Sequence, residues 1–210
     1  MTTFDAVIFD LGGVVFPSPF EAFDAYDRDA GLEPGTVRAL IKTSSETGAW
    51  AALERGELAM PDFYASVGAE AAAAGFELDG ARLMSMIASG FGPRPAMAGA
   101  IKRIRDAGLR TAALTNNWPS TDTKAPSANG NALGFDVIVE SAVVGLRKPD
   151  PRIYELVLSH LAVDAGATVF LDDLGINLKP ARAMGMTTIK VTDPDVALSE
   201  LSGVLGFEVA

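Results

Sequence analysis

Apolar and polar positions follow two different rhythms along this chain. Residues 6–9 form a short apolar run, and similar runs recur at 110–115, 136–139, 168–171 and 187–191. Runs of this length without alternation favour strands buried on both faces, as in parallel sheets covered by helices. Helical patterns accompany the last four runs, at 95–107, 152–161, 180–184 and 194–205. This alternation predicts an α/β fold with a Rossmann-like parallel sheet of about five strands.

A long span without strand patterns follows the first run. Between residues 20 and 89, glycines separate five candidate amphipathic helices at 21–29, 36–44, 47–55, 61–74 and 79–89. Segment 16–19 holds two prolines, which cannot continue a sheet, and is interpreted as a hinge. We therefore expect an all-helical domain inserted at 17–92 and a core built from 1–16 and 93–210. Segment 119–131, rich in small polar residues, Pro and Gly, is expected to be a flexible loop.

Polar residues stand at or soon after the ends of four apolar runs. They are Asp10, Thr115 with Asn116, Lys148, and Asp172 with Asp173. Taken singly, each has an ordinary structural explanation, such as a turn after a strand, a solvated lysine or a helix cap. Because parallel strands present their carboxyl ends at one edge of the sheet, we expect these side chains to meet in one crevice.

The combination of carboxylates and an ammonium group suits phosphoryl transfer. Clustered carboxylates favour a hard cation such as Mg²⁺. A carboxylate that attacks phosphorus forms an aspartyl phosphate, which water then hydrolyses. We predict that Asp10 is this nucleophile and also a metal ligand, and that Lys148 neutralises both the phosphate and Asp10.

The remaining candidates supply binding groups for the same reaction. Thr115 and Asn116 are predicted to hold phosphate oxygens. Asp173 is predicted to bind the metal directly, and Asp172 is predicted to belong to the same metal site as an indirect group, placed next to the direct ligands.

Composition narrows the classes of ligand. The chain has 17 Lys and Arg against 27 Asp and Glu, a formal charge of -10, and no basic run of the kind that nucleic acid needs. The absence of cysteine excludes disulfides, thiol catalysis and cysteine metal sites. No secretory pattern opens the chain, and no apolar run approaches about 18 residues. We expect a cytoplasmic protein with a small phosphorylated substrate, no nucleic-acid or membrane partner, and an undetermined oligomeric state.

Four motifs resemble those of the haloacid dehalogenase superfamily of hydrolases. They are residues 7–13 (VIFDLGG), 114–117 (LTNN), 148–151 (KPDP) and 170–173 (FLDD). The resemblance spans residues 5 to about 192 and implies a Rossmann-like core with an inserted helical C1 cap that covers the site and selects the substrate. Segments 50–57, 116–118 and 177–182 are similar more narrowly to the phosphatase-like N-terminal domains of soluble epoxide hydrolase and of acyl-CoA dehydrogenase family proteins.

One position departs from the pattern of the family's phosphatases. They usually carry a second aspartate two residues after the nucleophile, which acts as general acid and then as base, and here that residue is Gly12. The resemblance implies that the Gly12 carbonyl still binds the metal, whereas the proton-transfer role is vacant. General acid and base help is worth roughly 10² to 10⁴ in rate, or about 3 to 5 kcal/mol of barrier.

Three functional interpretations follow from this departure. The first is a Mg²⁺-dependent phosphatase, slow on alkyl phosphates, that takes a proton from elsewhere or prefers leaving groups that need none. The second is a catalytically weak module that binds phosphorylated ligands. The third is a metal-independent 2-haloacid dehalogenase, ranked last because that chemistry has no use for an Asp172–Asp173 metal site.

Overall fold

The computed structural model describes residues 4–43, 46–90, 92–119 and 133–210. Its centre is a parallel five-stranded sheet with the order β3-β2-β1-β4-β5. The strands are β1 (Ala6–Phe9), β2 (Arg110–Thr115), β3 (Val137–Glu140), β4 (Thr168–Asp172) and β5 (Thr187–Lys190). The predicted α/β class and parallel sheet are therefore confirmed. Of the loop predicted at 119–131, all but the first residue lies outside the described residues.

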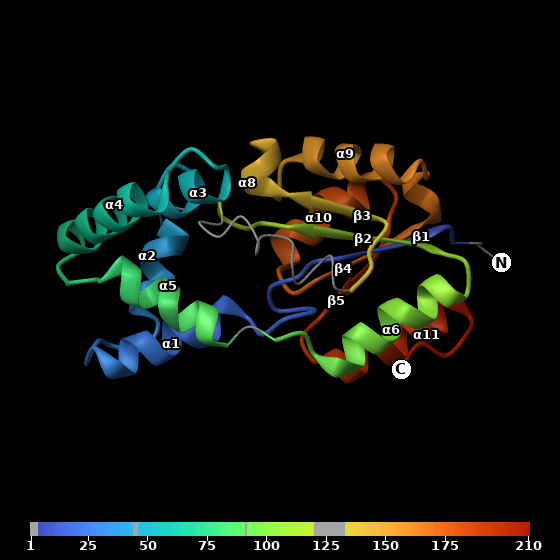
Figure 1. Cartoon of the computed structure of the whole chain (residues 1–210), viewed down its shortest axis with the longest axis horizontal. Helices are drawn as coiled ribbons and strands as arrows, with labels where there is room; N and C mark the ends of the chain where they lie inside the picture. Colours follow the sequence, from blue (N-terminus) through green and yellow to red (C-terminus); the bar gives the residue numbers. More distant parts are fainter. Residues whose placement is uncertain (1–3, 44–45, 91, 120–132) are drawn as a thin grey trace.

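Helices cover both faces of the sheet (Figure 1). Helices α6 (Pro95–Asp106) and α11 (Pro194–Leu205) pack on the face that receives Val7 and Phe9 of β1. Helices α9 (Pro151–Leu161) and α10 (Gly175–Ala183) pack on the opposite face, with Ala6 and Ile8. All four residues of β1 are fully buried, which explains why this strand is a continuous apolar run.

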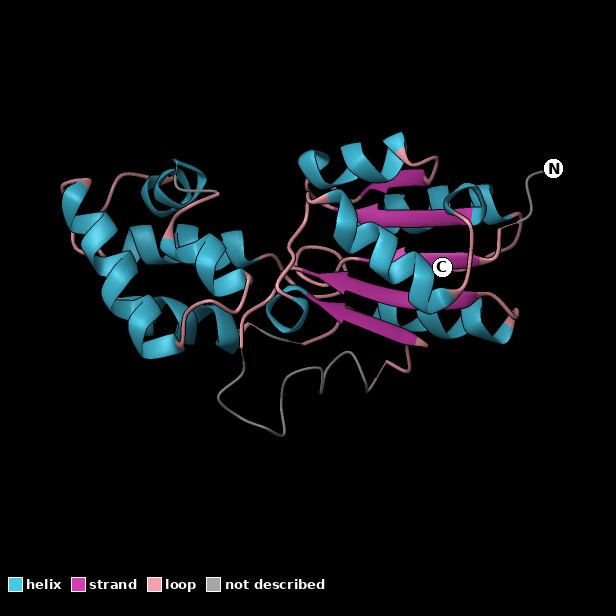
Figure 2. Cartoon of the chain, turned by 90° about the horizontal axis from the view of Figure 1, so that it is seen from above, coloured by secondary structure: helices cyan, strands magenta, loops and turns pink. Residues whose placement is uncertain are grey.

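A second group of helices lies beyond the carboxyl ends of the strands, whose arrowheads point toward it in Figure 2. It contains α1 (Pro19–Asp29), α2 (Thr36–Thr43), α3 (Ala49–Glu54), α4 (Met60–Ala73) and α5 (Gly80–Ser89). These helices share a hydrophobic cluster around Trp50, whose ring lies 5.3 Å from Phe23 and 5.8 Å from Phe63. The five predicted helices are confirmed, and the described residues between 20 and 89 contain no strand.

Two connections join this helical group to the core. In the first, the Ser18 side chain accepts a hydrogen bond from Phe20 N and caps α1, and Pro19 occupies the first turn, where its missing N–H costs nothing. The second connection is held against the first, because Arg94 N donates to the Val15 carbonyl at 2.8 Å. The segment interpreted as a hinge is thus one of two neighbouring segments that connect the helical group to the core.

Two helices of the core differ from the prediction. Helix α10 begins at Gly175, five residues earlier than predicted, and contains Pro180 in its interior. A proline there removes a helical hydrogen bond, but Leu178 and Ala181 are buried against the sheet, so packing outweighs the local preference. Helix α8 (Ser141–Val144) was not predicted, because four residues are too few to show a helical period.

Candidate active site

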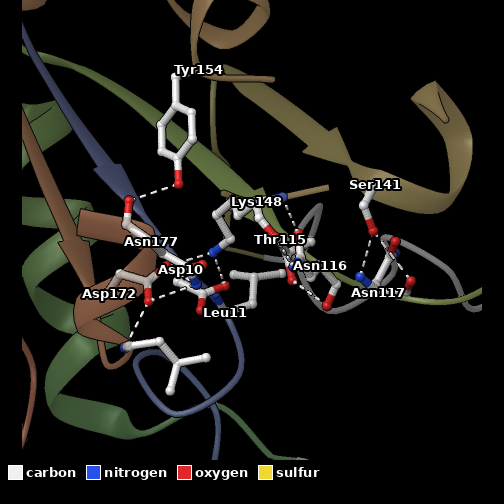
Figure 3. Close-up of polar contacts among 11 residues, drawn as sticks. Asp10, Leu11, Thr115, Asn116, Asn117, Ser141, Lys148, Tyr154, Asp172 and Asn177 are labelled. Carbon is white, nitrogen blue, oxygen red and sulfur yellow. Dashed lines mark hydrogen bonds and ion pairs between the residues drawn. The ribbon is translucent and has the colours of Figure 1, made fainter. Parts of the chain in front are cut away.

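Asp10 lies directly after the central strand of the sheet (Figure 3). Its backbone N–H donates to the Leu171 carbonyl at 2.9 Å, so the neighbouring strand β4 fixes its position. Leu11 N donates to Asp10 Oδ1 at 2.7 Å and orients the carboxylate. The residue is only 7% exposed. Burial raises the pKa of Asp10 well above its usual value, against the opposing effect of Lys148.

Lys148 reaches this carboxylate from the loop between α8 and α9. Its Nζ lies 2.9 Å from Asp10 Oδ1 and 2.7 Å from Asp172 Oδ2, and the side chain is buried. Burial by itself lowers the pKa of Lys148, but the two carboxylates outweigh it and leave the pKa above its usual value. The structure therefore places a charged ammonium between two of the predicted acidic residues.

The Asn116 side chain is hydrogen-bonded to the backbone of Lys148. Its Oδ1 accepts a hydrogen bond from Lys148 N at 2.8 Å, and its Nδ2 donates to the Lys148 carbonyl at 3.0 Å. The next residue, Asn117, donates its N–H to Ser141 Oγ at 2.9 Å. The Asn116 amide is therefore engaged with the lysine loop. Phosphate binding by Asn116 and by the adjacent buried Thr115 stays a prediction.

Asp172, at the end of β4, is fully buried and has polar partners at both carboxylate oxygens. Oδ1 accepts from Leu174 N at 2.8 Å, and both oxygens lie 3.1 Å from Asn177 Nδ2. Tyr154 in turn donates its hydroxyl to the Asn177 carbonyl at 2.7 Å. With Lys148 on Oδ2 as well, these contacts suit a carboxylate that holds the lysine in place.

Asp173 completes a cluster of acidic oxygens. Oxygen atoms from Asp10, Asp172 and Asp173 lie within 4.8 Å of one another. Gly13 packs so tightly on this group, at a φ of 81°, that a Cβ atom there would lie 2.3 Å from Asp173 Oδ2. Burial, together with the Asp172 charge, raises the pKa of Asp173 to about 6.

The charges of this cluster fit a divalent cation. When all three carboxylates are ionised, they carry two more negative charges than the single ammonium of Lys148 balances, and a bound cation would favour this ionised state. Since Asp172 is already engaged, the carboxylates of Asp10 and Asp173 are those that could hold the ion. Oxygen ligands of this kind suit Mg²⁺.

Gly12 occupies the turn between Asp10 and the chain that crosses to α1. It pairs with Phe16 in an isolated bridge, so the turn folds back on itself. A Cβ atom on Gly12 would lie 3.6 Å from Pro19 Cδ, an ordinary contact distance. Space around Gly12 therefore admits a side chain, in contrast to the space around Gly13.

Sequence reasoning missed the groups that support the predicted residues. Asn177 and Tyr154 hold Asp172 from α10 and α9, and Ser141 holds the loop after β2. A part-buried ion pair between Glu54 of α3 and Arg147 was also missed. Two signals pointed to Asn177: its place in the similar segment 177–182, and its position about one helical turn after Asp172–Asp173, which the misplaced start of α10 obscured. Within the described ranges, no helix has the length and apolarity needed to cross a lipid bilayer.

Several curated proteins have sequences similar to this chain. A sesquiterpene phosphatase of Aspergillus oryzae is 30% identical over 98% of both chains. Acyl-CoA dehydrogenase family member 10 of Mus musculus is 36% identical over 98% of this chain but only 19% of its own length. Bifunctional epoxide hydrolase 2 of Sus scrofa is 43% identical over 50% of this chain and 20% of its own. This chain thus spans about a fifth of the last two proteins.

Solved structures show the same fold at low sequence identity. A crystal structure described as a dehalogenase matches with a TM-score of 0.70 at 19% identity over 98% of both chains. An enzyme of the family from Bacteroides thetaiotaomicron, in complex with magnesium and inorganic phosphate, matches with a TM-score of 0.62 at 17% identity, over 89% of this chain and 93% of its own. The model of the family described as haloacid dehalogenase-like hydrolase matches residues 4–185. The chain therefore belongs to the haloacid dehalogenase-like hydrolases.

Proposed function

We propose that this protein is a Mg²⁺-dependent phosphatase that acts on a small phosphorylated metabolite through an aspartyl-phosphate intermediate. The observation that carries the proposal is the cluster at the carboxyl end of β1, where one lysine faces three carboxylates. Such a site has a nucleophile, a cation for the phosphate, and surplus negative charge for a metal. The full-length match to a sesquiterpene phosphatase supports the same activity.

In the proposed reaction, a carboxylate oxygen of Asp10 attacks phosphorus while the bond to the leaving oxygen breaks. Water then attacks the phosphorus of the aspartyl phosphate and restores the Asp10 carboxylate. Lys148 stays charged throughout, because Asp10 and Asp172 surround it, and balances the charge on the phosphoryl oxygens. Thr115 and Asn116 would bind those oxygens as well.

Asp10, Asp173 and the Gly12 carbonyl are the groups that would hold Mg²⁺. A bound Mg²⁺ would offset negative charge on the transferred phosphoryl group. Asp172 would act indirectly, since Asn177, Leu174 N and Lys148 occupy its oxygens.

Residues 17–92 are proposed to act as a cap over this site, with 1–16 and 93–210 as the core. The helices of this segment lie beyond the strand ends where the cluster sits (Figure 2). Enclosing the reacting phosphate would exclude water other than the attacking molecule. The cap would also select the substrate.

A phosphate-release screen tests the proposal. Wild type and Asp10→Asn would be assayed with Mg²⁺ on acetyl phosphate, p-nitrophenyl phosphate, common phosphosugars and a sesquiterpenyl phosphate. We expect release by the wild type and a loss of about 10³-fold or more in the variant, because the nucleophile is gone. Equal release by both proteins would refute an aspartate-dependent phosphatase.

Other outcomes of the screen identify the alternatives. If neither protein releases phosphate but Mg²⁺ and phosphate still bind, the chain is a module for phosphorylated ligands. Halide release from 2-haloacids without Mg²⁺ would instead establish a dehalogenase. The solved dehalogenase that the chain resembles shows only that the fold is compatible with that chemistry.

The glycine at position 12 leads to a further prediction about how the rate depends on the leaving group. Without a proton donor at this position, aryl and acyl phosphates should be hydrolysed far faster than sugar phosphates. Gly12→Asp should raise turnover on sugar phosphates by about tenfold or more, because the space beside Pro19 accepts a side chain. A flat dependence of rate on leaving-group pKa would show that the proton comes from another group.

A further inference from the structure

Helix α3 connects the helical group to the core. Figure 1 shows α3 next to α8, and the two helices are in contact. In the turn after α3, Gly56 has a φ of 71°, and a Cβ atom there would lie 2.3 Å from the Ala142 carbonyl oxygen. A side chain cannot approach backbone oxygen so closely, so this position requires glycine. The contact is therefore a close fit between two backbones.

A part-buried ion pair crosses the same contact. Arg147 Nε and Nη2 lie 2.7 and 2.6 Å from Glu54 Oε2, at the end of α3. The indole of Trp50 donates to Glu54 Oε1 at 2.9 Å. The two charged side chains are only 10% (Glu54) and 20% (Arg147) exposed. Removing Arg147 would leave the buried Glu54 carboxylate without this counter-charge, which makes the pair a strong constraint.

The pair reaches the lysine of the proposed active site. Arg147 directly precedes Lys148, whose backbone is held from the other side by Asn116. Trp50 also meets Trp118, two residues after Asn116, with ring centroids 6.0 Å apart. One short helix of the helical group thus contacts both loops that carry the predicted phosphate-binding residues.

We propose that Glu54 is a positioning residue: by holding Arg147 from α3, it fixes Lys148 against Asp10 and couples docking of the helical group to assembly of the site. This inference rests on the proposed phosphatase function. Glu54 acts through Arg147, and its contribution depends on charge and geometry together. The exposed pair of Arg38 with Asp24, within the helical group, offers a matched contrast because both side chains are 46% exposed.

The test compares Glu54→Gln, Arg147→Gln and the double variant with Asp24→Asn. Glutamine at 54 keeps an oxygen for the Trp50 indole but removes the charge. With Mg²⁺ and p-nitrophenyl phosphate, we expect kcat to fall about tenfold in each single variant, and KM can rise at the same time as phosphate binding weakens. The double variant should be no worse than either single variant, and Glu54→Asp should recover part of the activity. Asp24→Asn should stay within about twofold of the wild type.

Tryptophan fluorescence provides a readout that does not depend on turnover. The chain has two tryptophans, Trp50 and Trp118, and both lie in this contact. Emission would be recorded while inorganic phosphate is added in the presence of Mg²⁺. We expect a response in the wild type and about tenfold weaker phosphate binding in Glu54→Gln and Arg147→Gln.

These readouts separate failure of the inference from failure of the proposed function. If the wild type releases no phosphate, the function is wrong, and phosphate binding alone decides the role of Glu54. Unchanged kcat and unchanged phosphate affinity in both variants would overturn the positioning role. A raised KM at constant kcat would also overturn it, because that pattern indicates direct substrate binding. If Glu54→Gln does not fold, Arg147→Gln decides the question.

Discussion

The adjacent residues Arg147 and Lys148 belong to two different groups of charged side chains. The two groups differ in the balance of positive and negative charge. Lys148 faces the carboxylates of Asp10 and Asp172, with Asp173 beside them, whereas Arg147 pairs with the carboxylate of Glu54. A cluster with surplus negative charge is costly until a cation binds, while a balanced pair needs no ligand. The comparison shows how neighbouring residues can serve different ends. We propose that the first group binds a ligand, whereas the second joins the helical group to the core.

The largest effect is expected from removing the positive charge of Lys148 from the acidic cluster. Lys148→Met leaves Asp10 and Asp172 buried without a counter-charge, so we expect a loss of about 3 to 5 kcal/mol in unfolding free energy. Phosphate release should fall by about 10² to 10³-fold. Urea unfolding and the release assay measure the two effects. Lys102→Met is the control, because Lys102 pairs with Asp106 on the surface and should contribute less than about 1 kcal/mol.

The next largest effect is expected from Mg²⁺ bound to the acidic cluster of Asp10, Asp172 and Asp173. Mg²⁺ at 100 times its dissociation constant should stabilise the wild type by about 2.7 kcal/mol, seen as a rise in Tm. Asp173→Asn should abolish this rise. Without Mg²⁺, the same variant should be at least as stable as the wild type, because one of three like charges is gone. Asp164→Asn, on the surface, should keep the response. A full Mg²⁺ response in Asp173→Asn would place the ion elsewhere.

A smaller effect is expected from two adjacent glycines beside this cluster. Gly13→Ala would push a methyl group onto Asp173 from a left-handed backbone, at a cost of about 1 to 3 kcal/mol. Gly12→Ala meets only an ordinary contact and should change stability by less than about 1 kcal/mol. Thermal unfolding of the two variants, with and without Mg²⁺, measures the difference. Equal stabilities would mean that Asp173 moves aside without cost.

The smallest effect is expected from removing the hydrogen bond that Trp50 donates to Glu54 of the pair with Arg147. Trp50→Phe removes the indole N–H that Glu54 Oε1 accepts but leaves Arg147 in place, so we expect a loss of about 1 kcal/mol. Urea unfolding is the measurement. Tyr64→Phe, in the same hydrophobic cluster, is the control, and should have a smaller effect. A loss well above about 1 kcal/mol in Trp50→Phe would assign the excess to the smaller buried ring rather than to the hydrogen bond.

The ends of the strands could be predicted from the sequence, and so could the residues that meet there. Short apolar runs locate Asp10, Thr115 and Asp172 within a residue, because burial on both faces leaves no other pattern. The helices of the inserted segment followed from their period in the same way. These features depend on neighbours in the chain, so the chain itself carries the signal.

Contacts between the helical group and the core could not be predicted. Glu54 and Arg147 are 93 residues apart, and nothing in the local pattern of either residue indicates the other. The start of α10 was misplaced because Pro180 is a strong local stop signal, whereas burial of Leu178 and Ala181 overrides it. Support for the site by Asn177 was missed for the same reason.

The central position of β1 has a consequence for the order of folding. Ala6 pairs with Arg110 on one side and Thr168 on the other, so the strand that positions Asp10 has no neighbour until more than a hundred further residues exist. Pairing over such separations is slow, because a long loop must close first. The helical group, with its contacts between consecutive helices, is expected to form early. During synthesis, the site would thus assemble after the helical group.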